Sequence, residues 1–334
     1  MKKFISVVLV VMITTAGFTQ ENVGQLHENA RKFMSQGDYS NAALILNKAH
    51  TLSPNDLEVT KDLALSYLFQ SNNNKALETI TPTLEREDAD DQCYQIAGSV
   101  YQALGRADEC EKLYKKAVKK FPSSGGLYND YGELLWNRQD YSGATTQWEN
   151  GINADPSYSK NYYNACRNYY LSGDNVWAIL CGEIFLNMDP ASSKTPEIKN
   201  ILLESYKLVF TNISSLLNKK DNSKFTAVFL EALNKQSDLA ANGITPETLT
   251  MIRTRFILDW YQNDATKYPF RLFDLQKQLL QTGMFDAYNQ WIFGTAQNLS
   301  AYQNWTIAHT AEYNEFNYFQ RGRIFKIPKG QYYK

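Results

Sequence analysis

The stretch SQGDYSNAALILNKAHTLSPND, at residues 35–56, has a counterpart near the middle of the chain: NRQDYSGATTQWENGINADPSY, at residues 137–158. Both carry Asp-Tyr-Ser near the start, an alanine a few residues later and a proline near the end. The two stretches start 102 residues apart, which is three times 34. Because recurrence at a fixed period of this length is typical of stacked structural repeats, the sequence predicts a 34-residue unit repeated in tandem.

The 34-residue period holds for four kinds of position. Steps from Gly37 reach residues suited to a turn: Ser71, Gly105, Gln139 and Gly173. Steps from Ala42 reach small residues: Ala76, Cys110, Ala144 and Ala178. Steps from Pro54 reach helix-ending types: Asp88, Pro122, Pro156 and Pro190. Steps from Phe33 reach large apolar residues: Tyr67, Tyr101, Leu135 and Tyr169. Five units follow without insertion: 23–56, 57–90, 91–124, 125–158 and 159–192.

Within each unit the apolar residues have helical spacing. The third unit shows it on both sides of Gly105, at Tyr94, Ala97, Gly98 and Tyr101 and again at Cys110, Leu113, Tyr114 and Ala117. A unit therefore holds two helices of about 12–14 residues, neither of which can bury its apolar stripe alone. Pairing within a unit and stacking between units bury it, so we expect an all-α solenoid.

These positions resemble the tetratricopeptide repeat (TPR). In the first unit the resemblance is carried by Leu26, Ala30, Phe33, Gly37, Tyr39, Ala42, Leu46, Ala49 and Pro54. In the fourth it is carried by Tyr128, Tyr131, Gly132, Leu135, Tyr141, Ala144, Trp148, Gly151 and Pro156. The resemblance implies a right-handed superhelical solenoid of helix-turn-helix units. It further implies a non-catalytic scaffold or adaptor that binds a partner protein, or an extended peptide, in its concave groove.

Residues 193–334 lose the repeat phase and are expected to form a helical carboxy-terminal extension. Helices are predicted at 197–218, 225–235, 246–261 and 270–281, with a degenerate repeat near 269–302 and an extended tail at the end. One interpretation is a cap that buries the last apolar face of the array. The alternative is an enzyme or sugar-binding domain that uses the repeats as a docking arm, with Trp291 and Trp305 stacking on sugar rings.

The first twenty residues, MKKFISVVLVVMITTAGFTQ, have the pattern of a signal peptide: two lysines, an apolar run and then small and polar residues. Cleavage is expected between residues 16 and 20, and an uncleaved anchor is the alternative. No cysteine precedes Cys93, so acylation as a lipoprotein is not expected. The sequence therefore predicts an exported protein, periplasmic or secreted, of bacterial type.

Composition and motifs argue against several classes of function. With 34 basic and 35 acidic residues, the chain lacks the excess of cations that nucleic-acid binding needs. The three histidines are not spaced as metal ligands, and neither a phosphate loop nor a nucleophile elbow occurs. We therefore expect no catalytic residue, no cofactor and no metal.

The four cysteines have two interpretations. Cys110 and Cys166 stand at small-residue positions of the repeat and fit there as compact apolar side chains. In an antiparallel pair of helices, Cys166 and Cys181 would lie about 4.5 Å out of level. A disulfide between these two nevertheless stays open.

The TPR resemblance also places a candidate binding groove. In the family, the first helix of each unit lines it, and the fourth and fifth units contribute Asn129, Glu133, Trp136, Asn137, Tyr163, Asn164, Arg167 and Tyr170. Asparagine amides pair with a peptide backbone, and aromatic rings add contact area. The alternative is that the carboxy-terminal helices fold into the groove and use these eight groove residues as internal contacts.

The first three units do not reproduce the family's carboxylate clamp. Their groove positions hold His27, Arg31, Asp62, Gln92 and Ile96. Since Asp62 would repel a carboxylate, binding of a carboxy-terminal peptide by such a clamp is not expected.

Overall fold

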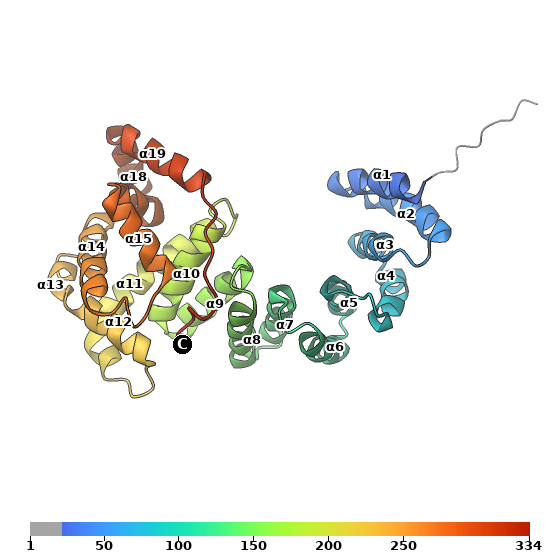
Figure 1. Cartoon of the computed structure of the whole chain (residues 1–334), viewed down its shortest axis with the longest axis horizontal. Helices are drawn as coiled ribbons and strands as arrows, with labels where there is room; N and C mark the ends of the chain where they lie inside the picture. Colours follow the sequence, from blue (N-terminus) through green and yellow to red (C-terminus); the bar gives the residue numbers. More distant parts are fainter. Residues whose placement is uncertain (1–21) are drawn as a thin grey trace, which may run out of the picture. The chain divides into compact units, whose positions relative to one another are not determined.

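The computed structural model describes residues 22–334, and the predicted signal peptide lies outside them. The described residues form helices and no strand, which confirms the all-α prediction. The part that carries the repeats contains α1 (Val23–Ser35), α2 (Tyr39–Leu52), α3 (Leu57–Phe69), α4 (Asn73–Ile80), η1 (Thr81–Glu85), α5 (Asp91–Ala103), α6 (Ala107–Lys120), α7 (Gly125–Asn137), α8 (Tyr141–Ala154), α9 (Ser159–Ser172) and α10 (Asn175–Met188). The chain divides into two compact units, one ending at Leu104 and one beginning at Gly105 (Figure 1).

In the first compact unit the helices pair as the period predicts. Helix α1 packs on α2, and α3 packs on both α2 and α4. Ala30 and Ala42, at the small positions, are fully buried, and Leu46 fills the space beside them. The short α4 has a local cause, because Pro82 lacks a backbone N–H and the chain continues as the 3₁₀ helix η1.

The turn inside each unit depends on one left-handed residue. All five predicted turn positions adopt positive φ: Gly37 at 77°, Ser71 at 61°, Gly105 at 70°, Gln139 at 65° and Gly173 at 80°. Glycine adopts this conformation freely, whereas for other residues it costs about 1–2 kcal/mol. The geometry of the turn is therefore kept even where the sequence has lost the glycine.

The N-cap positions follow the same period, although Asn72, Arg106 and Tyr158 make no side-chain cap. The position before each helix recurs every 34 residues. Before the first helices of the repeats it holds Asn22, Asp56, Asp90, Ser124 and Tyr158. Before the second helices it holds Asp38, Asn72, Arg106, Asp140 and Asp174. Asp38 and Asp140 accept hydrogen bonds from the backbone N–H groups of Asn41 and Gly143. Such caps satisfy N–H groups that have no partner within the helix.

In the second compact unit, α7 packs on α8 and α9 packs on α10. Gly132 lies directly against the indole of Trp148, so that a Cβ atom at this position would overlap the ring. The Trp148 indole N–H donates to the carbonyl of Asn129 at 3.3 Å. A small residue on one helix and a large one on its partner thus set the distance between the two axes.

The helical segments that follow the repeats are α11 (Thr195–Leu217), α12 (Lys224–Asn234), α13 (Ser237–Ala240), α14 (Pro246–Asn263), α15 (Arg271–Gln281), α16 (Phe285–Asn289), the π-helical turn η2 (Gln290–Gly294), α17 (Thr295–Gln297), α18 (Leu299–Ala308) and α19 (Thr310–Arg321). The four predicted helices agree with α11, α12, α14 and α15 to within two residues. Helix α11 packs on both α10 and α9 and so continues the helical row.

The region near 269–302 keeps a repeat-like turn without a second regular helix. Gly283, between α15 and α16, has a φ of 75°. After five residues α16 gives way to η2 and then to the short α17. A helical hairpin thus begins here as in a repeat, but its second helix is not a continuous α-helix.

A buried ion pair fastens the extension to the last repeat. Glu183 on α10 and Arg253 on α14 form a salt bridge, and both side chains are almost fully buried. The same Glu183 oxygen accepts from Gln276 Nε2 at 2.7 Å and from the Tyr288 hydroxyl at 2.8 Å. Burial lowers the pKa of Arg253, but the Glu183 carboxylate together with Tyr206 and Tyr288 outweighs it, so that the pKa is raised. Helices α10, α14, α15 and α16 therefore meet at one carboxylate.

The tail after α19 runs back to the repeats as an extended segment (Figure 1). The Tyr332 ring packs 4.7 Å from that of Trp177, and its hydroxyl contacts the Tyr169 hydroxyl. The Tyr333 ring stacks on Phe225 at 4.9 Å. Lys334 pairs with Asp174, the residue that caps α10. The tail thus joins α9, α10 and α12.

None of the four cysteines forms a disulfide, and all four are buried. Burial raises the pKa of the Cys110 thiol to about 12. The open question of a Cys166–Cys181 disulfide is settled against the bond, and both thiols act as small packing residues.

The left-handed turns predict an asymmetry between two alanine substitutions. Gly173→Ala should lower the free energy of unfolding by about 1–2 kcal/mol, because alanine is strained at positive φ even though no atom lies within 4 Å of its methyl group. Gln139→Ala should change it by only a few tenths of a kcal/mol, since glutamine is already strained in the same way. Urea unfolding measures both; equal effects would show that φ does not govern the turn.

The buried ion pair predicts strong non-additivity. Glu183→Gln should lower the free energy of unfolding by about 3–5 kcal/mol, because it leaves the Arg253 guanidinium buried without a counter-charge. The double variant Glu183→Gln, Arg253→Met should be more stable than the single variant. Additive losses in chemical denaturation would contradict this account.

Candidate partner-binding groove

The candidate groove follows the first helices of successive repeats. Helix α9 packs against α7 on one side and α11 on the other. All eight groove residues lie on α7 or α9. The structure therefore brings them to one row of helices, with α11 as its third member.

Three groove residues are engaged with each other. Asn164 Nδ2 donates to Asn129 Oδ1 at 2.9 Å and to Glu133 Oε1 at 3.2 Å. Asn129 Nδ2 donates to the same Glu133 oxygen at 3.1 Å. Asn129 is 1% exposed and Asn164 is 7% exposed, so these amides connect α7 to α9. They are not offered to a peptide backbone in this structure.

Two more groove residues bond to α11. Arg167 Nε donates to Glu197 Oε1 at 2.8 Å, and the Tyr163 hydroxyl donates to the other oxygen of Glu197 at 2.8 Å. Burial, together with the hydrogen bond to Glu197, raises the pKa of Tyr163 to about 12. One carboxylate on α11 thus fixes the orientation of both side chains.

Of the remaining groove residues, Trp136 packs against other side chains, whereas Asn137 and Tyr170 face solvent at least in part. Trp136 packs between Tyr141, with ring centres 4.7 Å apart, and Trp148, at 5.9 Å. The Arg167 guanidinium lies 5.8 Å from the centre of the Trp136 ring. Asn137 is exposed, and Tyr170 is half-buried.

An open hollow of about 280 Å³ lies between α9 and α11. This α9–α11 hollow is lined by Arg167, Tyr170, Leu171, Glu197, Asn200, Ile201 and Glu204. Leu171 lies at the edge of this hollow and is 65% exposed, so most of its apolar side chain faces solvent. The hollow combines this leucine and a tyrosine with a fixed Arg–Glu pair, and it can accept an apolar side chain.

Sequence reasoning found two of the seven lining residues, Arg167 and Tyr170. The predicted repeat frame ends at residue 192, before α11, so the predicted groove residues include none from this helix. The signal was nevertheless present: Glu197, Ile201 and Glu204 stand 34 residues after Tyr163, Arg167 and Tyr170. The groove face of a sixth first helix is thus kept in α11.

In the first compact unit the corresponding face carries a ladder of charged pairs. Asp62 Oδ2 lies 2.7 Å from His27 Nε2 and 2.7 Å from Arg31 Nε. Lys61, which is almost fully buried, pairs with Asp90 at 2.5 Å. These groups bond consecutive repeats to one another, and Asp62 stands where a bound carboxylate would be repelled.

The tryptophans of the alternative hypothesis are not open platforms. Trp291 is 7% exposed and packs against Tyr288 and Phe316, with the Lys199 ammonium 4.6 Å from its ring centre. Trp305 is half-buried and stacks on His309 at 4.4 Å. Trp291 therefore serves the packing of the extension rather than the stacking of a sugar.

Within residues 22–334, none of the helices is both long and apolar enough to cross a bilayer. The same residues contain no group of three or more His, Cys, Asp or Glu side chains that could hold a metal ion.

The comparisons with known proteins agree with this architecture. The model of the family described as anaphase-promoting complex, cyclosome, subunit 3 matches residues 35–117. BBSome complex member BBS4 of Bos taurus is 26% identical over 135 residues, which cover 40% of this chain and 26% of that protein. Photosystem I assembly protein Ycf3 of Prochlorococcus marinus is 28% identical over 104 residues, 28% of this chain and 60% of that protein. The chain thus spans about a quarter of the first relative and 60% of the second.

Solved structures give matches of the same kind. A thermophilic TPR protein of Thermus thermophilus has a TM-score of 0.45 at 16% identity, covering 56% of this chain and 99% of that one. YrrB, a TPR protein with an unusual peptide-binding site, has a TM-score of 0.38 at 16% identity, covering 57% of this chain and 94% of that one.

The fold defines an all-helical repeat protein, with paired helices, a left-handed turn and a period of 34 residues. The repeats therefore have the TPR fold, and the family model matches residues 35–117 of them.

The groove geometry predicts different roles for two of its asparagines. Asn129→Ala should lower the free energy of unfolding by about 1–2 kcal/mol, because it removes a buried acceptor and donor between α7 and α9. Asn137→Ala should change it by less than about 0.5 kcal/mol, since this side chain is exposed. Thermal and urea unfolding test the pair; a neutral Asn129→Ala would mean that the amide is free for a ligand.

Proposed function

We propose that this protein is a non-catalytic scaffold that holds an extended segment of a partner protein along α7, α9 and α11. The observation that carries the proposal is the α9–α11 hollow, where Leu171 stays exposed beside a tyrosine and a fixed Arg167–Glu197 pair. Interfaces obtain most of their binding energy from a few such anchors at well-packed positions.

The rigid surroundings of the hollow support this role. Glu197 is held by Arg167 and Tyr163, so its position is set before a ligand arrives. A preorganised site loses less conformational entropy on binding than a mobile one. An aliphatic side chain of the partner would lie on Leu171 and Ile201, while the half-exposed Arg167 and Glu197 mark the polar rim.

Recognition of the partner's backbone falls to the exposed amides. Asn129 and Asn164 bond to each other, whereas Asn137 and Asn200 face solvent on α7 and α11. An amide group offers a donor and an acceptor, the pair that an extended backbone presents. The proposed segment therefore crosses from Asn137 over Tyr170 to Asn200.

We further propose that the protein acts outside the cytoplasm, in the periplasm or secreted. The proposal is supported by the signal-peptide pattern of residues 1–20, in which two lysines precede an apolar run and a stretch of small and polar residues. A partner of the α9–α11 hollow would then be met in the same compartment.

A peptide-display experiment tests the groove. A library of unstructured peptides is selected on the protein, and the enriched sequences are retested on Leu171→Asp and on Leu258→Asp. The two leucines are equally exposed, at 65% and 64%, but Leu258 lies on α14 outside the hollow. We expect Leu171→Asp to abolish binding, because it places a charge in an apolar contact, and Leu258→Asp to retain it.

Equal binding to both variants would remove the site from the α9–α11 hollow. Failure to enrich any sequence would contradict peptide binding as such. Circular dichroism of both variants shows whether the helices are intact.

A further inference from the structure

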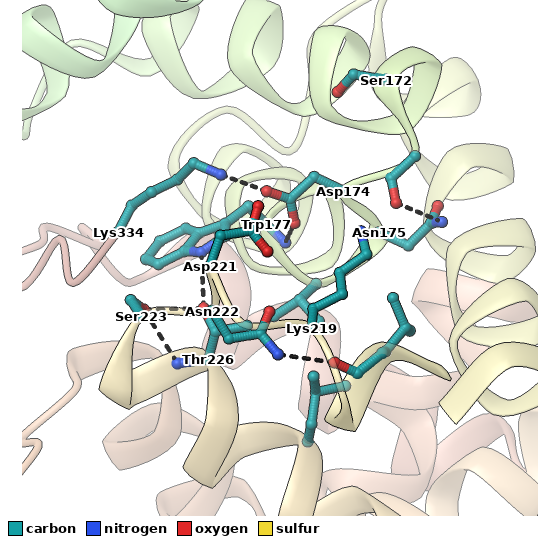
Figure 2. A pocket seen from close by; sticks show the side chains of 14 residues that line it. Ser172, Asp174, Asn175, Trp177, Lys219, Asp221, Asn222, Ser223, Thr226 and Lys334 are labelled. Atoms are coloured by element: carbon teal, nitrogen blue, oxygen red, sulfur yellow. Dashed lines mark hydrogen bonds and ion pairs between the residues drawn. The ribbon is translucent and has the colours of Figure 1, made fainter. Parts of the chain in front are cut away.

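Two further hollows lie where the tail meets the repeats, and they share no lining residue with the α9–α11 hollow. One hollow of about 310 Å³ lies beside Trp177 and the segment between α11 and α12. Another of about 460 Å³ lies along α8 and α9. Both are lined by Ser172, Asp174 and Lys334. Because these three residues line both, the two hollows adjoin at the Asp174–Lys334 ion pair and are together called the Asp174 trough. Figure 2 shows the first of the two hollows.

The trough is lined by groups that bond to hydroxyls. Ser142, Thr145 and Thr146 line the second hollow, Asn222 and Ser223 line the first, and Ser172 lines both. Figure 2 shows the side chains of Lys219 and Asp221 around the same opening as Asp174. Lys219 and Asp221 are exposed at the end of α11 and in the segment after it. A donor and an acceptor are therefore presented side by side.

The charges of the trough balance within its first hollow. Asp174 and Asp221 are matched there by Lys219 and Lys334. The second hollow adds one further carboxylate, Glu149, which accepts a hydrogen bond from the Tyr169 hydroxyl. A strongly cationic ligand would be attracted by the two aspartates and repelled by the two lysines, and a strongly anionic ligand would meet the reverse. The first hollow therefore favours an uncharged ligand with many hydrogen-bonding groups.

The second hollow of the trough also presents an aromatic ring. Tyr141 lines the second hollow and is 49% exposed. Trp136 contacts it edge-on, at 4.7 Å and 67°, and so holds the orientation of the ring. A half-exposed ring held in place is a surface on which the apolar face of a sugar can lie.

From these features we infer that the Asp174 trough binds a neutral saccharide. Tyr141 supplies the stacking surface, while Asp221 and Lys219 bond to hydroxyl groups. Lys334 stands between the two hollows in an ion pair whose members are 31% and 32% exposed. A ligand that occupies both hollows displaces Lys334 from Asp174.

Calorimetric titration of the protein with maltohexaose, cellohexaose and chitohexaose tests the inference. We expect saturable binding of at least one of these neutral sugars. Tyr141→Ala and Asp221→Asn should each weaken it about tenfold, since each removes one direct contact. The controls Tyr318→Ala and Asp238→Asn, which lie on α19 and α13, should leave it unchanged.

Two further measurements make the result decisive. Lys334→Ala should tighten binding several-fold, and weaker binding would overturn the role of Lys334 as an obstacle. Trilysine serves as a competing probe: its binding in place of all three sugars would overturn the inference and assign the trough to ammonium groups. Absence of sugar binding, with helices intact by circular dichroism, would also overturn it, whereas the peptide proposal for the α9–α11 hollow would be unaffected.

Discussion

The rest of the structure depends on the close approach of two helices within each repeat. Gly132 against Trp148, and the fully buried Ala42 and Ala144, show that the contact leaves no room for a larger side chain. The left-handed residue between the helices, Gly173 in the fifth repeat, turns the chain within a few residues so that the second helix returns along the first. When these two conditions recur at a period of 34, each hairpin presents its apolar face to the next, and the row of first helices follows.

The end of this row explains the carboxy-terminal extension. A repeat array leaves its last apolar face uncovered unless something caps it. Here α10 is buried almost throughout, by α11 and by the helices that meet at Glu183. The tail adds a second attachment through Tyr332 and Tyr333, whose rings pack on α10 and α12. The extension therefore caps the array, and its aromatic residues mostly form that contact.

Much of the fold follows from the sequence because its determinants are local and periodic. The turn at Gln139 follows from the period of Gly105 and Gly173, although glutamine, unlike glycine, does not adopt a positive φ freely. The groove was less predictable. Position within the repeat identified Asn129 and Asn164, but only the packed structure shows that they bond to each other. Glu183 could not be recognised as a buried counter-charge, since its partners lie 70 to 105 residues further along the chain.

The hydrogen bonds between α7, α9 and α11 fix the inner polar groups of the groove, while the α9–α11 hollow stays open. We propose above that a segment of the partner occupies the α9–α11 hollow. Hydrogen–deuterium exchange, measured on the protein alone and with a peptide enriched by display, tests it most directly. The account predicts slower exchange in residues 163–173 and 195–208 on binding, with no change in α14. Protection confined to α12–α19, or to the first compact unit, would contradict it.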